Sequence, residues 1–263
     1  MSATLTVLGA GAILPQPGRG PAGYALRQGA DQPVTLLDCG PGSVRMLGTV
    51  GIGVEEIERV VLSHFHLDHC LDVFALAFAR RNPQLKDVPQ LEIIGPPGVA
   101  AWLQRSAEAL GRWALDPDLT VCEVELDGEG RATVSRSAMR FTAQLNGHTH
   151  PALSWRVSLD YGLSLTYSGD TNDDPRVAAL ARDTDLFLCE CSFPDGQGTD
   201  NHLTPGQAGA LAQSARARRL LLTHFYPGTD PGESKRNAAR HFSGPIELAQ
   251  DGSVHRIQAP DQS

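Results

Sequence analysis

Ser63-His64-Phe65-His66-Leu67-Asp68-His69 places three histidines and an aspartate within six residues, directly after the apolar run Val60-Val61-Leu62. The apolar run is typical of a buried strand, and a loop that follows a strand can direct several side chains to one point. Because side chains alternate along an extended chain, the imidazoles of His64 and His66 lie on the same side. Asp68 and His69 then lead into an apolar helix, and this turn of the chain would bring them, as a second pair of donors, back over the first pair. One metal ion needs three or four such donors, so this stretch predicts a metal centre with room for two ions.

The composition is that of an ordinary globular protein. The 263 residues are 41% hydrophobic and 20% charged, which allows a sizeable core. A formal net charge of -8 argues against a large nucleic-acid-binding surface. The five scattered cysteines predict no disulfide framework and fit a reducing cytoplasm. We see no signal peptide at the N-terminus and no apolar run of membrane-spanning length, so we expect a cytoplasmic protein with no membrane partner.

Strand and helix signals alternate in both halves of the chain. We expect strands at residues 5–9, 24–27, 34–37, 60–62, 91–95, 155–158, 163–168, 186–190, 220–223, 246–249 and 254–257. We expect helices at 54–59, 72–81, 98–113, 204–217 and 234–241, with a short one that ends at Leu47. The fourth begins with a capping box at Thr204 and Gln207 and a proline between them. Residues 118–144 alternate in short runs, which predicts a second antiparallel sheet with its hairpin turn at Asp127-Gly128-Glu129-Gly130.

Further polar side chains follow the ends of predicted strands. Asp170 comes after the strand at 163–168, His224 comes after the one at 220–223, and His148 ends a strand-like run. Asp38 ends the strand at 34–37, where an active-site role and a turn role are both open. Since random core histidines would not gather at strand ends, we expect two sheets that meet at one rim. We find no linker, and we predict a single α/β domain over residues 1–263.

These motifs resemble the ordered ligand motifs of the metallo-β-lactamase superfamily: His64-x-His66-x-Asp68-His69, His148, Ser168-Gly169-Asp170-Thr171 and Leu222-Thr223-His224. Finer features resemble its ribonuclease Z and phosphodiesterase branch: the opening Gly-x-Gly turn with a Pro-rich loop, Leu37-Asp38-Cys39-Gly40-Pro41-Gly42, and Asn201-His202-Leu203-Thr204. The similarity runs from about residue 5 to residue 257. It implies an α/β (α+β) fold, the four-layer αββα sandwich of this superfamily, in a single domain.

The resemblance also implies a role for each donor. His64, His66 and His148 would bind one ion, Asp68, His69 and His224 the other, and Asp170 would bridge the two. Imidazoles and carboxylates suit zinc, with manganese or iron as alternatives. Two such ions about 3.5–4 Å apart would share a water, lower its pKa and clamp the attacked and leaving oxygens. Asp68 could orient or deprotonate that water.

Two further histidines need their own interpretation. His202 precedes the capped helix, and the resemblance places such a histidine over the substrate, where it would neutralise a phosphoryl oxygen or protonate the leaving group. The alternative for His202 is a surface loop residue. His150 lies two residues from His148 and could replace it as the ligand, although the spacing to Pro151-Ala152-Leu153-Ser154-Trp155 favours His148.

The resemblance predicts a dinuclear-metal hydrolase, and one departure bears on its substrate. Ribonuclease Z enzymes usually carry a long arm that grips transfer RNA, between the strand at 155–157 and the Ser-Gly-Asp-Thr motif, and here only residues 158–166 intervene. With the acidic charge, this favours a small phosphodiester, such as a cyclic nucleotide or cyclic sugar phosphate, over nucleic acid. The alternatives are an arylsulfatase-like sulfate ester or lactone hydrolase and a transfer-RNA 3'-processing endonuclease. A non-catalytic metal-binding scaffold is the alternative of another class, although such relatives lose ligands and all seven are retained here. The branch usually forms dimers, so we expect a homodimer.

Overall fold

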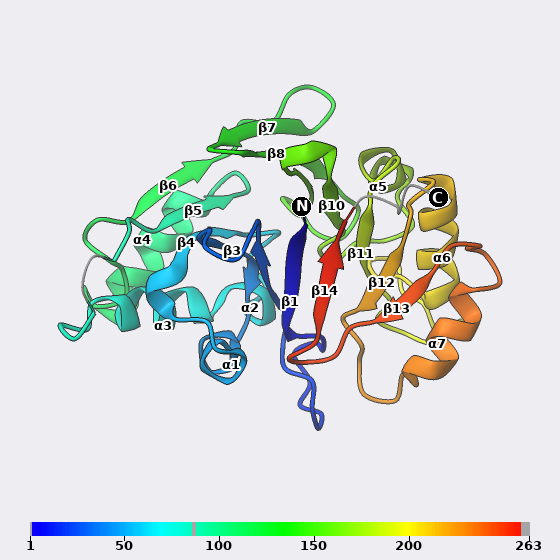
Figure 1. The fold of residues 1–263 in the computed structure, drawn as a ribbon, viewed down its shortest axis with the longest axis horizontal. Coiled ribbons are helices and arrows are strands. Elements are labelled where there is room, and N and C mark those ends of the chain that lie inside the picture. The colour runs from blue at the N-terminus through cyan, green and yellow to red at the C-terminus, as the bar shows by residue number, and fades with distance from the viewer. Residues whose placement is uncertain (1, 86–87, 259–263) are drawn as a thin grey trace.

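Two β-sheets lie face to face in the computed structural model, which describes residues 2–85 and 88–258 (Figure 1). Within these residues each sheet has seven strands. The first sheet has the order β14-β1-β2-β3-β4-β5-β6 and the second the order β13-β12-β11-β10-β9-β8-β7. The first contains β1 (Ala3–Gly9), β2 (Gly23–Arg27), β3 (Val34–Cys39), β4 (Ile57–Val61), β5 (Glu92–Gly95), β6 (Thr120–Glu123) and β14 (Val254–Ile257). The second contains β7 (Arg131–Arg136), β8 (Met139–Leu145), β9 (Leu153–Ser158), β10 (Ser164–Tyr167), β11 (Leu186–Glu190), β12 (Leu220–Thr223) and β13 (Ile246–Leu248).

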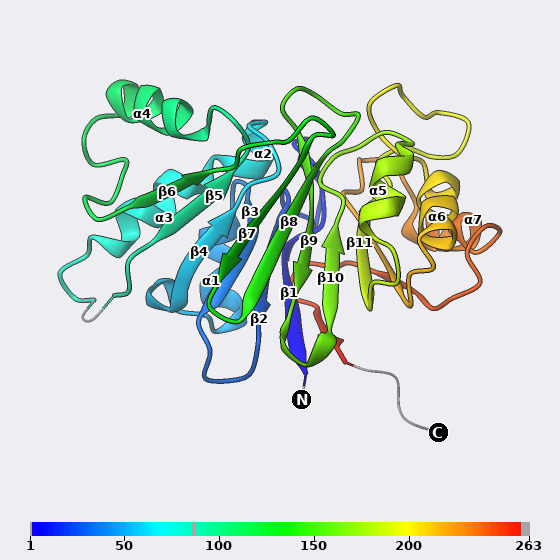
Figure 2. The same ribbon diagram turned by 90° about the horizontal axis from the view of Figure 1, so that it is seen from above.

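Helices cover the outer faces of the two sheets, as Figures 1 and 2 show. The first half contributes α1 (Ser43–Val50), α2 (Leu67–Cys70), α3 (Asp72–Arg80) and α4 (Val99–Leu110), with a 3₁₀ turn at Val54–Glu56. The second half contributes α5 (Pro175–Leu180), α6 (Pro205–Ser214) and α7 (Pro231–Ala238), with a 3₁₀ turn at Asp160–Gly162. One apolar cluster fills the space between the sheets, and a separate cluster lies between each sheet and its helices. The predicted four-layer αββα architecture is therefore confirmed. The predicted domain limits, 1–263, include residues 1, 86–87 and 259–263, which lie outside the described residues.

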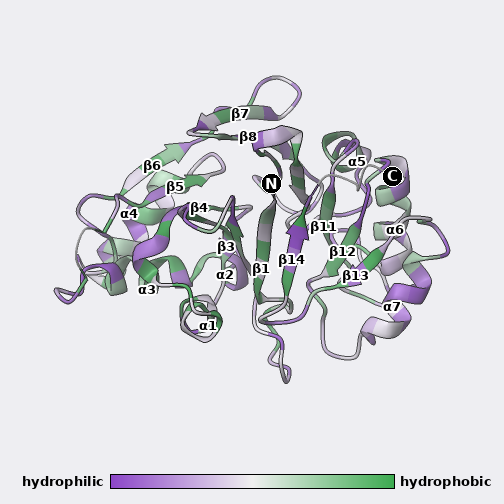
Figure 3. Cartoon of the chain, in the orientation of Figure 1, coloured by the Kyte–Doolittle hydropathy of each residue, from purple (hydrophilic) through white to green (hydrophobic). Residues whose placement is uncertain are grey.

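The sequence of each strand reflects how many of its faces are buried. The central strands β11 and β12 are fully buried and almost continuously apolar, as strands covered on both faces must be. The edge strand β7 alternates exposed and half-buried residues, and its sequence alternates accordingly. In Figure 3 hydrophobic residues follow the strands of both sheets, whereas α7 is mainly hydrophilic.

Helices α5, α6 and α7 begin with the same local device. Asp174, Thr204 and Asp230 each accept a hydrogen bond from a backbone N–H in the first turn, and a proline follows each of them. The capping side chain accepts from a first-turn N–H that has no partner within the helix. Proline fixes the first helical φ, and the N–H that it lacks would have had no partner in the helix either. The capping box predicted for Thr204 and Gln207 is confirmed. The same signal at Asp230-Pro231 starts α7 three residues before the predicted Ser234.

Two predicted helices are wrong in part. Residues 54–59 form only a 3₁₀ turn, after which β4 begins at Ile57, because this segment pairs in parallel with β3 and β5. Helix α4 ends at Leu110 rather than Trp113, since Gly111 adopts a φ of 98°, outside the helical range. Helix α5 was not predicted at all, although its Asp-Pro start is visible in the sequence.

The prediction of one antiparallel sheet over 118–144 is also wrong. Strand β6 pairs in parallel with β5 and completes the first sheet, whereas β7 and β8 form an antiparallel hairpin of the second. Asp127-Gly128-Glu129-Gly130 therefore lies in the crossover between the sheets, and the hairpin turn is at Ser137-Ala138. Alternating runs do not reveal the partner of a strand, which is set by contacts far away in sequence.

Hydrogen bonds join the two sheets near the rim where the polar side chains gather. The indole of Trp155 donates to the carbonyl of Leu62 (3.0 Å), and the hydroxyls of Tyr24 and Thr223 lie 2.8 Å apart. The backbone N–H of Leu153 donates to the carbonyl of Ser63 (3.0 Å). These links fix the ends of β4, β9 and β12 relative to one another. Among the described residues, none of the helices has the length and apolar character of a membrane span.

Candidate metal centre

The predicted donors come together at one rim of the sandwich. His64 and His66 follow β4, and Asp68 and His69 lie on the single turn of α2. The remaining three follow the strands of the second sheet: His148 after β8, Asp170 after β10 and His224 after β12. Both sheets thus contribute to the same point, as the position of these residues at strand ends predicted.

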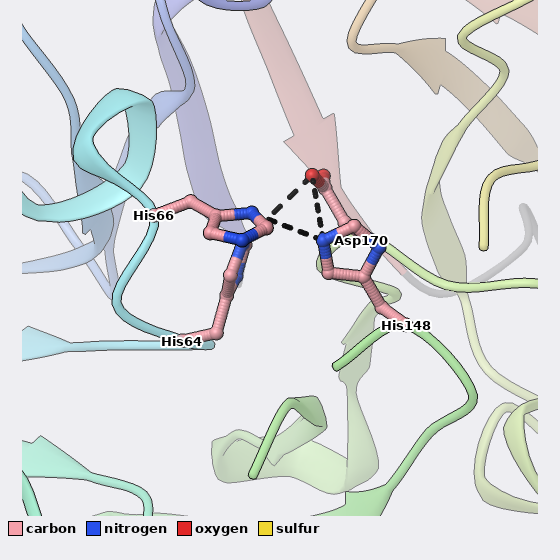
Figure 4. Close-up of side chains that lie close together, drawn as sticks. All are labelled: His64, His66, His148 and Asp170. Atoms are coloured by element: carbon pink, nitrogen blue, oxygen red, sulfur yellow. Dashed lines mark hydrogen bonds and ion pairs between the residues drawn. The ribbon is translucent and has the colours of Figure 1, made fainter. Parts of the chain in front are cut away.

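The first donor group contains His64, His66, His148 and Asp170, whose ligand atoms all lie within 4.8 Å of one another. Figure 4 shows these side chains pointing toward one another. Oδ2 of Asp170 is 3.9 Å from Nε2 of His64 and 3.7 Å from Nε2 of His148. Nδ1 of His66 is 3.1 Å from Nε2 of His148. His66 is exposed, so this side of the group faces solvent.

The second donor group contains Asp68, His69 and His224. Oδ2 of Asp68 is 3.6 Å from Nε2 of His224 and 3.9 Å from Nε2 of His69. Asp170 reaches this group too, because its Oδ2 is 3.2 Å from Nε2 of His69 and its Oδ1 is 3.4 Å from Nε2 of His224. The Asp170 carboxylate therefore lies between the two groups, where a bridging ligand would lie. The role of each individual ligand stays a prediction.

Buried donor atoms without partners show that the residues fit metal ions. Nε2 of His64, His69 and His224 and Oδ1 of Asp170 are buried, and none has a hydrogen-bond partner among the described residues. Leaving such a group unsatisfied costs about 1–3 kcal/mol. Four of them directed into the same space would be expensive unless a ligand compensates, and imidazole nitrogens with a carboxylate suit a divalent ion such as zinc.

The ring orientations also leave the right nitrogens free. His69 donates from Nδ1 to the carboxylate of Asp38 (2.7 Å), and His148 donates from Nδ1 to the carbonyl of Asn201 (2.7 Å). Because these partners can only accept, the proton of each neutral ring is on Nδ1 and the lone pair is on Nε2. Such partners fix the tautomer of metal-binding histidines.

The same relay of hydrogen bonds supports one histidine in each donor group. His64 donates from Nδ1 to the hydroxyl of Ser63 (2.9 Å), which donates to Asp38 (2.7 Å). His224 donates from Nδ1 to the hydroxyl of Ser192 (2.9 Å), which donates to Glu190 (2.5 Å). On both sides of the centre, a donor histidine is thus linked through a serine hydroxyl to a buried carboxylate.

Asp38 and Glu190 thus orient the donor histidines through hydrogen bonds. Between an active-site role and a turn role for Asp38, the structure favours the former, since its carboxylate also accepts from the hydroxyl of Tyr167 (2.7 Å). Glu190 was missed by the sequence analysis. It accepts from the backbone N–H of Thr171 (2.8 Å) and Leu203 (3.2 Å) as well. A glutamate that ends an otherwise apolar strand is the signal that could have identified it.

The electrostatics of the centre are set by two carboxylates, Asp68 and Asp170, among imidazoles. Burial, assisted by the charge of His69, holds the pKa of His64 well below its usual value. Burial also lowers the pKa of His148. Burial opposes ionisation of Asp170, but His224 and His69 outweigh it and hold the pKa of that carboxyl well below its usual range. For His69, burial lowers the pKa, and the stronger combined effect of Asp170 and Asp38 raises it well above the usual value.

His202 lies beside both donor groups. Its ring centre is 4.7 Å from that of His148 and 5.8 Å from that of His224. Its Nδ1 lies 3.0 Å from Oε1 of Glu190. Burial lowers the pKa of His202, but the hydrogen bond to Glu190 outweighs burial and raises it overall. The predicted surface-loop alternative does not describe this half-buried ring, and its role toward substrate stays a prediction.

His150 is exposed and belongs to neither donor group. Of the two candidates left open by the sequence, the structure thus brings only His148 to the centre.

Comparison with known proteins identifies the family. A family model described as a β-lactamase superfamily domain matches residues 35–225, which include Asp38, both donor groups and His202. An uncharacterized protein of Mycobacterium leprae is 33% identical over 265 residues, covering 98% of this chain and 90% of the relative. The chain belongs to the β-lactamase superfamily.

The relatives that match along nearly their whole length include proteins named ribonuclease Z. A relative from Mycobacterium bovis that is named ribonuclease Z is 29% identical over 280 residues, with 97% of both chains covered. The crystal structure of the metallo-β-lactamase fold protein YhfI from Bacillus subtilis has a TM-score of 0.84 at 23% identity, covering 97% of this chain and 100% of that chain. The family and fold predicted from the sequence motifs are both confirmed.

Proposed function

We propose that this hydrolase cleaves small phosphodiesters, cyclic nucleotides or cyclic sugar phosphates, with two divalent ions as cofactors. The observation that carries the proposal is the position of the Asp170 carboxylate between two complete donor groups. This arrangement supports a dinuclear centre. Displacement at phosphorus places negative charge on the attacking and the leaving oxygen, and a pair of ions can stabilise both. Zinc is the expected metal, and manganese or iron would fit the same donors.

The proposed division of labour follows the two donor groups. One ion would be held by His64, His66 and His148. The other would be held by Asp68, His69 and His224, and Asp170 would bind both ions. Bound there, the ions would act as Lewis acids on the phosphoryl oxygens and lower the pKa of a nucleophilic water.

Two side chains would act on the substrate itself. Asp68 is buried beside His224, where its carboxylate can orient the attacking water and accept its proton. Against burial, the bond to Glu190 raises the pKa of His202, and in its protonated form this ring can neutralise a phosphoryl oxygen or donate a proton to the leaving oxygen. The exposed edge at His66 leaves an approach for substrate.

Transfer RNA remains the second candidate substrate. The connection between β9 and β10 is only a 3₁₀ turn at Asp160–Gly162, with no room for a protruding arm. However, a relative named ribonuclease Z is matched over 97% of its own length, which supports keeping transfer RNA as a candidate. The acidic net charge still favours a small substrate.

We also propose a cytoplasmic homodimer. The five cysteines are free, and four of them are buried thiols, which supports a reducing compartment. Exposed apolar side chains on and beside α3 and α4, namely Phe78, Leu110 and Trp113, support contact with another chain. The elution volume in size-exclusion chromatography, calibrated by light scattering, tests the dimer.

Hydrolysis of bis(p-nitrophenyl) phosphate by the metal-loaded protein tests the activity. Turnover that vanishes in Asp68→Ala, while an exposed-site variant such as His241→Ala keeps it, would support the proposal. If two bound ions are confirmed and no turnover is seen, the phosphodiester proposal fails. p-Nitrophenyl sulfate and a lactone, assayed in parallel, would then identify the sulfate-ester or lactone alternative.

A further inference from the structure

An aromatic pair, Phe193 and Tyr226, lies at the same rim as the metal centre. Strands β11 and β12 are parallel neighbours, and their register places Glu190 opposite Thr223. Three residues beyond these partners, the segments that follow the two strands place Phe193 and Tyr226 side by side. Their rings are stacked, with centroids 4.8 Å apart and an interplanar angle of 27°.

The pair is held in place by the backbone on both sides. The N–H of Tyr226 donates to the carbonyl of Ser192 (3.4 Å), and the hydroxyl of Thr229 donates to the same carbonyl (3.0 Å). The N–H of Phe193 donates to the carbonyl of Leu203 (3.4 Å), next to His202. The backbone that carries the two rings is therefore tied to the segments that carry His202 and His224.

Both rings border the catalytic side chains directly. The centroid of Tyr226 is 5.7 Å from that of His224 and 6.0 Å from that of His202, and Phe193 is 5.7 Å from His202. Burial together with the charges of Asp68, Asp170 and Glu190 raises the pKa of Tyr226 to about 12, so its ring is neutral at physiological pH.

Core packing does not account for the pair. Both rings are half-buried, and neither belongs to the apolar clusters that fill the described part of the fold. The stacked pair of Phe65 and Trp102 differs in this respect, because both of its rings pack against the cluster under α3 and α4. Fixed, partly exposed aromatic faces beside a reactive centre are the form in which proteins offer stacking surfaces to planar rings.

We propose that Phe193 and Tyr226 form the wall that binds a nucleobase, so that the enzyme selects base-bearing phosphodiesters over cyclic sugar phosphates. The proposal rests on the proposed phosphodiesterase function and narrows its substrate class to a nucleotide. A base stacked on this wall would leave its phosphate beside His202 and the donor groups. Stacking on one aromatic side chain accounts for a factor on the order of 5- to 150-fold in affinity per base.

Binding tests the wall independently of catalysis. We would measure by calorimetry the Kd of adenosine 5'-monophosphate and of ribose 5-phosphate for the metal-loaded protein and for its variants. We expect the base-bearing ligand to bind at least five-fold more tightly. Phe193→Leu and Tyr226→Leu should remove most of that difference, whereas Tyr226→Phe, which keeps the ring, should retain it. Tyr161→Leu, which changes an exposed aromatic residue elsewhere, is the matched control.

Turnover tests the proposed function together with the wall. The substrates are adenosine 3',5'-cyclic phosphate and the methyl riboside 3,5-cyclic phosphate, which differ only in the base. We expect the ratio of their kcat/KM values to fall at least five-fold in Phe193→Leu and Tyr226→Leu. Adenylyl-adenosine in the same assay distinguishes a mononucleotide from an RNA strand as the source of the base.

The binding measurement and the turnover measurement can fail independently of each other. If base selectivity is seen in binding but neither phosphodiester is hydrolysed, the proposed function is wrong and the wall stands as a nucleotide-binding surface. Equal affinities for the two ligands, or variants that lose both substrates in equal proportion, would overturn the wall and leave the phosphodiesterase intact. An equal loss in Tyr226→Phe and Tyr226→Leu would also overturn it, because the hydroxyl and not the ring face would then be the binding group.

Discussion

The carboxylate of Asp38 lies 2.7 Å from Nδ1 of His69, at the end of β3 and 31 residues away in sequence. Asp38 has a φ of 55°, a conformation that non-glycine residues rarely adopt and that costs of order 1–3 kcal/mol. The same carboxylate accepts from the backbone and hydroxyl of Ser63 and from the hydroxyl of Tyr167. These four hydrogen bonds compensate for the strain and direct Nε2 of His69 into the centre.

Asp38→Ala should therefore weaken metal binding without removing a ligand. Partners that orient metal-binding histidines typically account for 10- to 100-fold in affinity, so we expect a loss of about that size. Competition with a chromophoric chelator measures the zinc affinity directly. Asp185→Asn is the control, since Asp185 is also a buried aspartate that accepts from a backbone N–H but lies outside the donor groups. An Asp38→Ala protein with the zinc affinity of the unaltered chain would contradict the role assigned to Asp38.

Metal binding should raise the thermal stability of the protein substantially. Bound ions would satisfy the unpartnered atoms of His64, His69, His224 and Asp170. A ligand present at 100 times its Kd stabilises the folded state by about 2.7 kcal/mol. Differential scanning calorimetry of chelator-treated protein, with and without added zinc, should show the increase in Tm. The increase should shrink in His224→Ala but not in His150→Ala, and the same response in both variants would be evidence against the donor groups.

The sequence predicted which donor side chains gather at the candidate metal centre, because this information is local. His64, His66, Asp68 and His69 are encoded within one loop, and Asp170 and His224 each follow an apolar strand that needs no partner to be recognised. Strand β11 was predicted with its observed bounds, since a strand buried on both faces has a continuous apolar sequence. The cap of α6 is equally local.

The features that were missed depend on contacts between distant segments. Glu190 supports His202 and His224, but a single glutamate in a buried strand does not reveal which histidines will surround it. Strand β6 could not be assigned to the first sheet, because its pairing with β5 crosses helix α4. The register that places Phe193 beside Tyr226 likewise becomes visible only when β11 and β12 are paired.

Glu247 on β13 should make stability depend on pH. His255 donates to it from Nδ1 (2.6 Å), and this bond holds the pKa of Glu247 below its usual value, against burial and with help from Arg219. A carboxyl whose pKa is lowered by folding adds stability above its unfolded pKa, and that stability is lost as pH falls through the folded value. Glu247→Gln should thus lower the free energy of unfolding at pH 7 by less than about 1 kcal/mol, since the pair is partly exposed to solvent.

Urea unfolding of the Glu247→Gln protein and the unaltered chain at several pH values checks this expectation. The difference between them should begin to shrink below the unfolded glutamate pKa of about 4.3 and approach zero only as the pH falls through the lower pKa of the folded state. Glu125→Gln, at an exposed position, serves as the control. A difference that stays constant between pH 7 and pH 3.5 would show that the effect of Glu247 is steric and not electrostatic.

His202→Ala should reduce catalysis and leave the metal content unchanged. Its Nδ1 is bound by Glu190, and its ring lies next to those of His148 and His224, so its remaining nitrogen can meet a substrate held by the donor groups. General acid–base groups contribute typically 10²–10⁴-fold, and we expect a fall of that size in kcat for bis(p-nitrophenyl) phosphate. Metal analysis of the purified variant should still give two ions per chain.

The metal analysis separates two chemical roles for this histidine. His202 also lies within ligand distance of Asp170 and His224, so it could in principle complete a coordination shell. Loss of one ion in His202→Ala would make it a ligand and contradict the substrate role. Retention of both ions with normal kcat would remove it from the mechanism altogether. Glu190→Gln distinguishes further, provided that metal analysis shows two ions, because Glu190 also supports His224 through Ser192. If Glu190 acts on catalysis by holding the His202 ring, this variant should lower kcat in the same direction as His202→Ala and add little to it in the double variant.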